Sequence, residues 1–258
     1  GVQSICKHCG LYFQNCPDTL MVFSDADQCG TKVNWSDPVA FDNCDEELDV
    51  TQVGRPASGS FFEVGGPYPI TYEATDDDGN TITCTFHIVV MDGQNPNAVC
   101  RDISTIVDQN CEAVIYPTDI DGGSSDNCGI ENMLISRDGV NFYDSLTLGN
   151  QDLSPPDINI TLQVIDSSGN TSICVASVTV VDGNDPMTFC PDDITVSTEP
   201  GVCYGKVPDV TPVFDTLDNC LPIASLRQEP IPGTLFGSHP SDSISIAVIA
   251  EDQGGNLD

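Results

Sequence analysis

An internal repeat constrains this chain more than any other feature of its sequence. Three markers recur: an Asp-Asn-Cys triplet, a Gly-Asn pair and a cysteine that opens each unit. They stand at Asp42-Asn43-Cys44, Asp126-Asn127-Cys128 and Asp218-Asn219-Cys220, at Gly79-Asn80, Gly169-Asn170 and Gly255-Asn256, and at Cys16, Cys100 and Cys190. Their offsets of 84 and 92, 90 and 86, and 84 and 90 residues agree on a period just under 90. The sequence therefore predicts the end of a preceding segment over 1–14 and repeats over 15–95, 96–186 and 187–258, the last one truncated.

The residues around each Gly-Asn pair alternate between apolar and polar, which is the period of half-buried strands. In the first repeat the apolar positions are Ile70, Tyr72 and Ala74 before the pair and Ile82, Cys84, Phe86, Ile88 and Val90 after it. Two such runs across a short turn predict a β-hairpin, because glycine reaches positive φ without a Cβ clash. Clusters of Pro, Gly and Asp predict an earlier hairpin around Asp25–Cys29 and around Glu199–Cys203.

Units just under 90 residues long, with about seven short strands and frequent turns, fit an antiparallel sandwich. No window carries an apolar stripe of helical period. A domain of this size buries only about 60–65% of its unfolded surface, so covalent support is expected. The predicted fold class is all-β, in tandem immunoglobulin-like antiparallel β-sandwich repeats stapled by disulfides. Trp35 follows the strand pattern and is expected in the core.

The charge of the chain excludes whole classes of partner. Lys and Arg number 7 against 40 Asp and Glu, which gives a net charge of -33 at pH 7. A phosphate backbone is recognised through clusters of Lys and Arg, so nucleic-acid binding is excluded. No apolar run approaches the roughly 20 residues of a membrane span, and no signal peptide is present. Carboxylates are hard oxygen ligands, so Ca²⁺ is the small partner expected.

The 13 cysteines indicate an oxidising, extracellular compartment. Structural zinc needs four soft ligands brought together, usually by paired short-spaced motifs. Only one CxxC occurs, at Cys6-Lys7-His8-Cys9, and the sequence has no second short-spaced pair that would complete a zinc site with it. Disulfides therefore explain the cysteines better than metal does, and Cys6 and Cys9 are expected to belong to the preceding segment.

The motifs of the first repeat resemble the hyalin repeat (HYR) family of immunoglobulin-like extracellular modules. They read CPDTLMVF, CGTKVNW, PVAFDNC, GSFFEVG and ITYEATDDDGNTITCTFHIVVMD. The third repeat resembles the family through CPDDITVSTEPGVC and DTLDNC, and the middle repeat resembles a variant found in tandem arrays of large bacterial surface proteins. This middle repeat departs from the pattern because it lacks the Gly-Ser-Phe-Phe segment. The resemblance implies adhesive or structural modules on a cell surface rather than enzymes.

Each full repeat has four cysteines, and the sequence alone leaves all three connectivities open. In an immunoglobulin-like sandwich the first and last strands can lie in parallel, which favours Cys16–Cys84 and Cys100–Cys174. The HYR resemblance leans the same way. Those pairs would leave Cys29 with Cys44 and Cys111 with Cys128, and in the third repeat Cys203 with Cys220. The fourth cysteine of that repeat would lie four residues after Asn256, so the odd total is attributed to truncation.

Acidic turns and repeat junctions supply the candidate calcium ligands. They are Asp76 and Asp78 before the first Gly-Asn pair, Asp92 and Asn95 at the first junction, Asp166 before the second pair, and Asp182, Asn184 and Asp185 at the second junction. Acidic Asp/Asn-Pro junctions of this kind are similar to those at which cadherins bind Ca²⁺ and stiffen. The alternative is that Asp, Asn and Gly only form turns and keep the surface soluble.

Short triplets also mark candidate glycosylation sites. Asn34, Asn159 and Asn170 begin N-type acceptor triplets. Thr19, Ser145, Thr216 and Ser243 lie in triplets that resemble an O-glycosylation motif of some gliding and gut bacteria.

No nucleophile elbow, zinc-protease motif or phosphate-binding loop occurs, so the chain is predicted not to be an enzyme. The predicted function is a structural and adhesive repeat region of a large cell-surface protein, forming a rod or filament. Its expected partners are its own neighbouring repeats and cell-surface or matrix molecules. Two alternatives remain open: a subunit of a polymeric extracellular appendage or matrix, and spacer repeats of a secreted multidomain enzyme.

Overall fold

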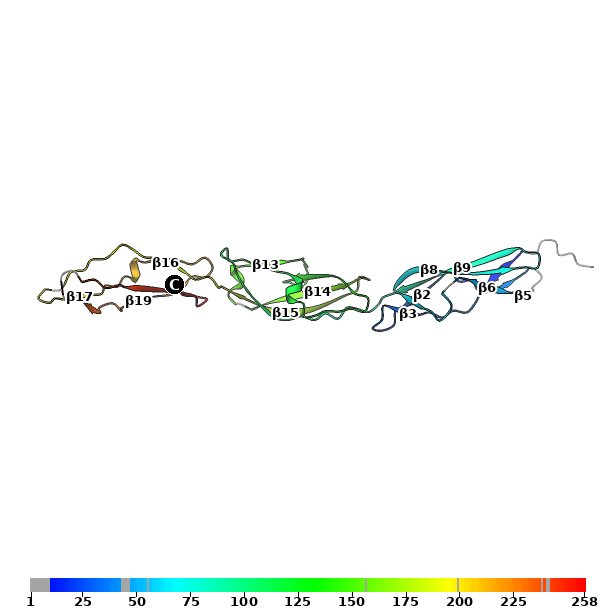
Figure 1. The fold of residues 1–258 in the computed structure, drawn as a ribbon, viewed down its shortest axis with the longest axis horizontal. Coiled ribbons are helices and arrows are strands. Elements are labelled where there is room, and N and C mark those ends of the chain that lie inside the picture. Colours follow the sequence, from blue (N-terminus) through cyan, green and yellow to red (C-terminus); the bar gives the residue numbers. More distant parts are fainter. Residues whose placement is uncertain are drawn as a thin grey trace, which may run out of the picture. The chain divides into compact units, whose positions relative to one another are not determined.

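The computed structural model describes residues 10–258 apart from 43–46, 55, 156, 199, 238, 240 and 241 (Figure 1). Cys44 and the segment with Cys6 and Cys9 therefore lie outside the described residues. The described chain consists of short strands, one α-helix of four residues and two 3-10 turns, which confirms the all-β prediction. No helix among the described residues has the length and apolar character needed to cross a membrane.

Strands in two layers form the first repeat. They are β1 (Tyr12–Gln14), β2 (Thr19–Phe23), β3 (Gly30–Lys32), β4 (Val39–Phe41), β5 (Glu47–Leu48), β6 (Val50–Val53), β7 (Phe61–Glu63), β8 (Gly65–Thr75) and β9 (Thr81–Met91). One layer is a four-stranded sheet in the order β2-β9-β8-β6, in which β2 and β9 run parallel and the other pairs antiparallel. The other strands form two smaller sheets, β3-β7 and β1-β4-β5.

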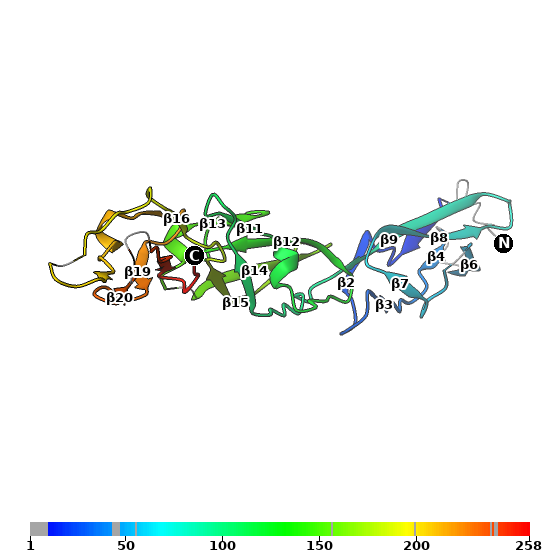
Figure 2. The same ribbon diagram turned by 60° about the vertical axis from the view of Figure 1, so that its left-hand side comes forward.

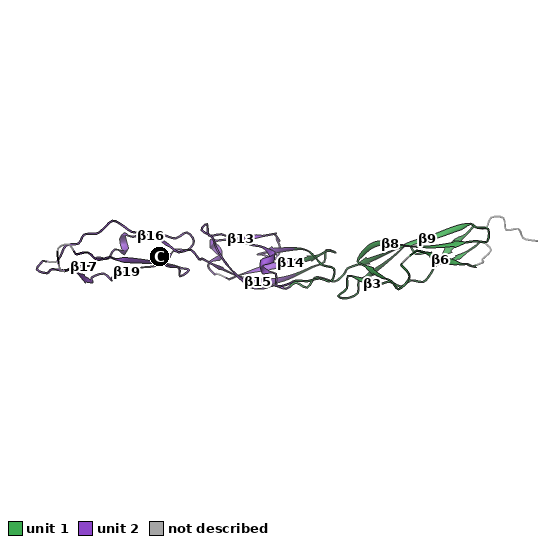
Figure 3. Cartoon of the chain, viewed as in Figure 1, with its two compact units in different colours: residues 1–98, 124–132, 164–172 green, residues 99–123, 133–163, 173–258 purple. Residues whose placement is uncertain are grey.

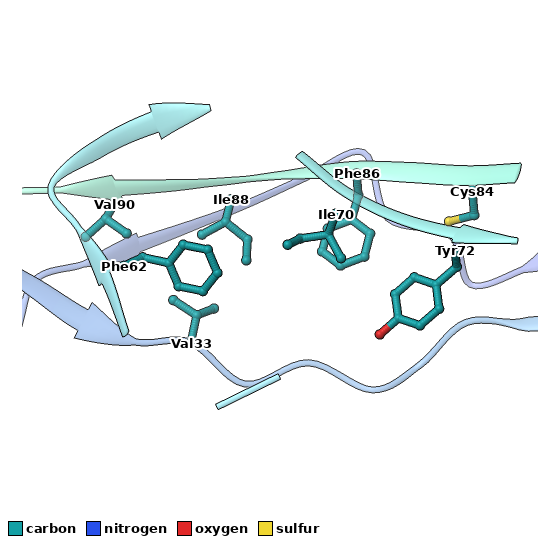
Figure 4. Packing of buried hydrophobic residues seen from close by; sticks show 8 residues of the cluster. All are labelled: Val33, Phe62, Ile70, Tyr72, Cys84, Phe86, Ile88 and Val90. Atoms are coloured by element: carbon teal, nitrogen blue, oxygen red, sulfur yellow. The ribbon is translucent and has the colours of Figure 1, made fainter. Parts of the chain in front are cut away.

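The core of the first repeat lies between these layers. Alternate residues of β8 and β9 point toward Val33 and Phe62, as Figure 4 shows. Phe86 is fully buried and Tyr72 is 2% exposed. Trp35 packs edge-on against Phe86 and Phe62 and donates its indole N–H to the Tyr72 hydroxyl at 2.8 Å. The period-2 pattern therefore predicted these core positions correctly, Trp35 included.

The Gly-Asn turn between β8 and β9 is the predicted hairpin. Gly79 has φ +85°, and the Asp76 amide donates to the Asn80 carbonyl at 3.0 Å. The hairpin predicted around Asp25–Cys29 is wrong, because the strands on either side of that turn do not pair with each other. Residues 25–30 do turn, since the Asp25 amide donates to the Gly30 carbonyl at 2.9 Å. However, β2 pairs with β9 and β3 pairs with β7, so this turn carries the chain from one layer to the other. Turn residues predict a reversal of direction but not the partner of the next strand.

The second repeat has the same arrangement of its large sheet. Its elements are β10 (Ile103–Ile106), β11 (Ala113–Ile115), α1 (Pro117–Ile120), β12 (Ile130–Ser136), β13 (Leu146–Leu148), η1 (Asn150–Asp152), β14 (Asp157–Asp166) and β15 (Thr171–Val181). The four-stranded sheet has the order β10-β15-β14-β12, with β10 and β15 parallel (Figure 2). Apolar residues on β14 and β15, among them Ile160, Leu162 and Val178, are fully buried.

The third repeat contains shorter sheets. Its elements are β16 (Met187–Phe189), β17 (Gly205–Lys206), η2 (Thr211–Val213), β18 (Asp215–Leu217), β19 (Ile223–Glu229), β20 (Leu235–Phe236) and β21 (Ala247–Asp252). The strand pairs are β16-β18, β17-β20 and β19-β21, each antiparallel.

By their contacts the residues form two compact units (Figure 3). Unit 1 comprises residues 1–98, 124–132 and 164–172, and unit 2 comprises residues 99–123, 133–163 and 173–258. A loop and a turn of the second sequence repeat are therefore grouped with the first repeat. The division into three repeats stays a prediction from the sequence period.

An ion pair between an exposed arginine and a buried aspartate in unit 2 gives a first prediction. Arg137 donates to both carboxylate oxygens of Asp152 at 2.6 Å, and Asp152 is 3% exposed. Arg137→Ala leaves this carboxylate buried without its cation and should lower the free energy of unfolding by about 2 kcal/mol. Thermal unfolding at pH 7 measures the loss. Arg227→Ala is the matched control, because Arg227 and Glu229 form an exposed pair that contributes little.

The same pair makes the loss depend on pH. The hydrogen bond from Arg137 holds the pKa of Asp152 below its ordinary value of 3.8. A carboxyl group with a lowered folded pKa contributes stability above its unfolded pKa and loses it as the pH falls through the folded value. The stability difference between the native chain and Arg137→Ala should therefore be largest near neutral pH and shrink below about pH 4. A difference that grows on acidification would contradict this assignment.

Candidate functional site at the repeat junctions

Four disulfides organise the described chain in two different ways. Cys16–Cys84 and Cys100–Cys174 join the region of the first strand of a repeat to its last strand, β9 or β15. These are the pairs that the parallel-strand argument favoured. The other two bonds connect a turn of one sequence repeat with the Asp-Asn-Cys triplet of the next, as Cys29–Cys128 within unit 1 and Cys111–Cys220 within unit 2.

The remaining pairings inferred from the sequence are wrong. Cys29 bonds Cys128 rather than Cys44, and Cys111 bonds Cys220 rather than Cys128. Cys203 does not pair with Cys220 and is an exposed thiol, as is Cys190. The physical reason is that the turn cysteine lies at one end of its sandwich, next to the linker that leads to the following repeat. Reasoning confined to one repeat could not place the partner in another.

Polar contacts accompany the bond in unit 1. We call the first junction the linker 92–97, the loop 126–128 and the turn 166–170, together with the turn that holds Cys29. The Asn127 side-chain amide donates to the Gln28 carbonyl at 3.0 Å. The Asn170 amide donates to the carbonyls of Asp92 and Gln94 at 3.3 and 3.2 Å. Two short loops of the second repeat are thus fastened to the end of the first.

Unit 2 contains an equivalent second junction, formed by the linker 182–186, the loop 218–220 and the turn 252–256. The Asn219 amide donates to the Gln109 carbonyl at 2.8 Å, as Asn127 does to Gln28. The Asn256 amide donates to the Asp182 carbonyl at 3.0 Å, as Asn170 does to Asp92. The sequence markers of the repeat are therefore the residues that build these junctions.

Aspartates gather inside both junctions. The nearest ligand atoms of Asp92, Asp126 and Cys128 lie within 4.8 Å of one another, and so do those of Asp182, Asp218 and Asp252. Each of the four linker and loop aspartates uses Oδ1 as a local acceptor, for example from the Gln94 amide to Asp92 at 3.1 Å. The Oδ2 atoms of Asp92, Asp126, Asp182 and Asp218 are buried and accept no hydrogen bond from any described residue.

The candidate calcium ligands taken from the sequence therefore differ in whether they lie in the two clusters. Asp92 and Asp182 lie in the clusters. Asn184 borders the second one and donates its amide to the Asp108 carbonyl at 3.1 Å. Asp166 is fully buried, with both oxygens holding its own turn through Asn170. The others are turn or surface residues outside the clusters: Asp76, Asp78, Asn95 and Asp185.

Sequence reasoning missed Asp126, Asp218 and Asp252 as cluster members. The signal was present, because Asp126 and Asp218 belong to the Asp-Asn-Cys marker and Asp252 stands four residues before the Asn of a Gly-Asn pair. The sequence shows these residues only as parts of repeat markers, because the residues that they meet in the clusters are distant in sequence.

Part of this chain matches a known protein family, and the chain is similar in sequence to known proteins. The model of the HYR domain family matches residues 13–90. Those residues are an HYR domain. Hyalin of Strongylocentrotus purpuratus is 31% identical over 242 residues, which are 88% of this chain and 18% of hyalin. A Rattus norvegicus protein, the sushi, von Willebrand factor type A, EGF and pentraxin domain-containing protein 1, is 33% identical over 93 residues, or 36% of this chain and 3% of the relative. The chain thus spans less than a fifth of hyalin.

Solved structures with a similar arrangement have low sequence identity. A three-immunoglobulin-domain structure of titin gives a TM-score of 0.39 at 11% identity, covering 98% of this chain and 96% of that chain. The extracellular cadherin domains 1–5 of protocadherin gamma B2 give 0.38 at 13% identity, covering 97% and 59%.

The HYR match fixes the broad class of residues 13–90. They form an extracellular, immunoglobulin-like module of the cell-surface adhesion type, which is a non-catalytic domain. The family expected from the sequence motifs of the first repeat is thereby confirmed.

The candidate glycosylation residues of the predicted repeats differ in exposure. Most are exposed: Asn34, Asn159, Thr19, Ser145 and Ser243, with Thr216 half-buried. Asn170 is half-buried, and its amide nitrogen donates to Asp92, Gln94 and Asp166. A glycan on that nitrogen would remove an N–H from the first junction, so Asn170 is the least suitable acceptor of the set. Glycosylation of these residues stays a prediction.

The contacts of Asn170 lead to a second prediction. Asn170→Ala should lower the free energy of unfolding of unit 1 by about 1–2 kcal/mol more than Asn80→Ala does. Asn80 is the matched control, since it occupies the same turn position in the first repeat and its side chain donates to Asp76. Trp35 is the only tryptophan and lies in unit 1, so its fluorescence during urea unfolding follows this unit. Equal losses in both variants would show that the junction contacts of Asn170 add nothing.

Proposed function

We propose that this chain is a structural and adhesive repeat region of a large cell-surface protein, in which tandem HYR repeats form a rod or filament that mediates adhesion. The observation that carries the proposal is the pair of bonds Cys29–Cys128 and Cys111–Cys220. Each fastens a turn of one sequence repeat to a loop of the next, so neighbouring repeats are held by a covalent link besides the linker. Spacer modules that only separate other domains have no need of such a link.

Strand pairing supports a mechanical role. β2 pairs with β9 in parallel through five residue pairs, and β10 pairs with β15 in parallel through four. In a parallel pair, tension that pulls the start of one strand away from the end of the other loads every ladder hydrogen bond together. An antiparallel hairpin at the same place would open one bond at a time. The disulfides Cys16–Cys84 and Cys100–Cys174 carry tension past the same strand pairs while they are intact, so the ladders bear it only after these bonds are reduced.

The charge of the chain supports a rod that stays solvated and separate from other copies of itself. A net charge of -33 on 258 residues makes like chains repel at low salt. Lateral association then requires a screening or bridging cation. The expected contacts of such a rod are its own neighbouring repeats and cell-surface or matrix molecules.

Small-angle X-ray scattering of the oxidised chain tests the rod. The native chain should scatter as an elongated particle with little flexibility, because the junction bonds restrict bending between repeats. A variant with Cys29, Cys111, Cys128 and Cys220 replaced by serine should scatter as a more flexible particle. A control that replaces only the free thiols Cys190 and Cys203 should match the native chain. A compact native particle, or a native chain as flexible as the variant, would overturn the rod.

Coated beads test the adhesive part. Beads carrying the chain should bind to each other or to a surface coated with extracellular matrix, and bovine serum albumin beads should not. Failure to bind either target at physiological salt, with or without divalent cations, would contradict an adhesive role for this region. Sedimentation velocity on the free chain separates a monomeric strand from a self-assembling filament.

A further inference from the structure

Buried carboxylate oxygens without donors occur at the same place in both junctions. In the first, Oδ2 of Asp92 and Oδ2 of Asp126 are buried and accept no hydrogen bond from a described residue. In the second, the same holds for Oδ2 of Asp182 and of Asp218. Asp92 is 8% exposed and Asp182 is 3% exposed. A buried carboxylate oxygen that accepts no hydrogen bond is unfavourable, and two of them lie close together at each place, so a bound cation there would compensate both.

The two clusters are built by corresponding residues of the repeats. Asp92 and Asp182 follow the last strand of a repeat, and Asp126 and Asp218 begin an Asp-Asn-Cys triplet. In both triplets Oδ1 of the aspartate accepts the amide of the cysteine, at 2.7 and 2.9 Å, which fixes the carboxylate and leaves Oδ2 for another partner. The same orphaned atom thus arises twice from one local geometry.

Further oxygens complete each cluster. In the first, Oδ1 of Asn127 is buried without a donor while its amide group holds the Gln28 carbonyl. In the second, the carboxylate of Asp252 lies within 4.8 Å of the other two and is 2% exposed. The sulfur of Cys128 is committed to its disulfide, so it is not a thiolate ligand. The ligands in both clusters are therefore oxygens only, and those of Asp252 also accept hydrogen bonds from Asn256 at 2.8 and 2.9 Å.

We propose that each junction binds one divalent cation of the Ca²⁺ type between the linker aspartate and the aspartate of the Asp-Asn-Cys loop. Carboxylate and amide oxygens are the ligands of hard cations, and Ca²⁺ accepts irregular sets of them. Mg²⁺ requires a stricter octahedral geometry, and zinc prefers nitrogen and sulfur. The cation neutralises the facing carboxylates and ties the loop of the following repeat to the linker. The proposal does not depend on the adhesive role.

Calorimetric titration of the oxidised, metal-free chain with CaCl₂ in 150 mM NaCl tests it. The native chain should bind two ions. Asp182→Asn with Asp218→Asn should remove one, and Asp92→Asn with Asp126→Asn should remove the other. The isosteric asparagines keep the volume of the site and can donate to their neighbours, so these variants should be at least as stable as the native chain in EDTA.

The control is Asp185→Asn, which makes the same kind of substitution once, at an exposed residue of the second linker. It should keep two ions, which separates a built site from general attraction of cations to an acidic protein. Adding Ca²⁺ to about ten times its Kd should raise the melting temperature of the native chain by a few degrees and leave that of the fourfold variant unchanged. MgCl₂ at equal concentration should raise it less. A lack of saturable binding, or a stoichiometry that the aspartate pairs do not alter, would overturn the proposal.

Discussion

Replacing Cys16 and Cys84 together with serine is expected to lower the free energy of unfolding of the first repeat by about 4 kcal/mol. The bridge closes a loop of 68 residues, and opening it restores the conformational entropy that the loop denies to the unfolded chain. The loss is a large fraction of the total stability of a small domain. Urea unfolding followed by Trp35 fluorescence measures it, because this tryptophan lies in the core of that repeat.

The matched control is Cys100→Ser with Cys174→Ser. It opens a loop of 74 residues in the second repeat and so carries a similar entropic cost. Trp35 lies in the core of the first repeat, so this variant should shift the midpoint of the fluorescence transition less than Cys16→Ser with Cys84→Ser does. A shift as large as that of the first variant would show that the repeats unfold as one cooperative body.

Phe86→Ala is expected to cost about 3–5 kcal/mol. The Phe86 ring is fully buried, lies 5.9 Å from the Trp35 ring and stacks on Tyr72 at 6.4 Å. Its removal leaves a cavity between the layers that neighbouring side chains fill only in part. The same fluorescence experiment measures the loss, and the folded emission of Trp35 should also shift to the red because water gains access to the indole.

Phe23→Ala is the control for Phe86→Ala. It is the same substitution on β2 of the same repeat, but the Phe23 side chain is 63% exposed. We expect a change within about 0.5 kcal/mol there. Comparable losses in the two variants would mean that β8 and β9 do not form the core of this repeat.

The fold could largely be predicted because its determinants are local. Alternation along β8 and β9 places Ile70, Tyr72 and Phe86 on one face, and the Gly-Asn turn that joins the strands needs a positive φ, which Gly79 supplies. The chain crossing near Asp25 could not be predicted, because a turn with the same residues can join strands of one sheet or of two. Pairing of β3 with β7 decides it, and those strands are about thirty residues apart.

The junction site was predicted only in part, for the same physical reason. Asp92 and Asp182 were recognised because they stand in acidic Pro-containing linkers, a property visible in a few residues. Asp126 appears in the sequence only as part of a repeat marker, because its part in the site depends on Asp92, a residue of the preceding repeat. The disulfide Cys29–Cys128 failed to emerge in the same way. An internal period shows which residues recur but not which copy each one meets.

The bridges between first and last strands also determine how far the chain can lengthen. Tension that enters near Cys16 passes directly to Cys84, and from Cys100 to Cys174, so the 68 and 74 residues between them carry none of it. At about 3.4 Å per extended residue, the two bridges keep about 230 and 250 Å of contour length from being stretched. A chain with its disulfides intact can therefore lose its β-sheets without lengthening much. Reduction of all four disulfides would release that hidden length, so the redox state of the surroundings sets the extensibility of the chain.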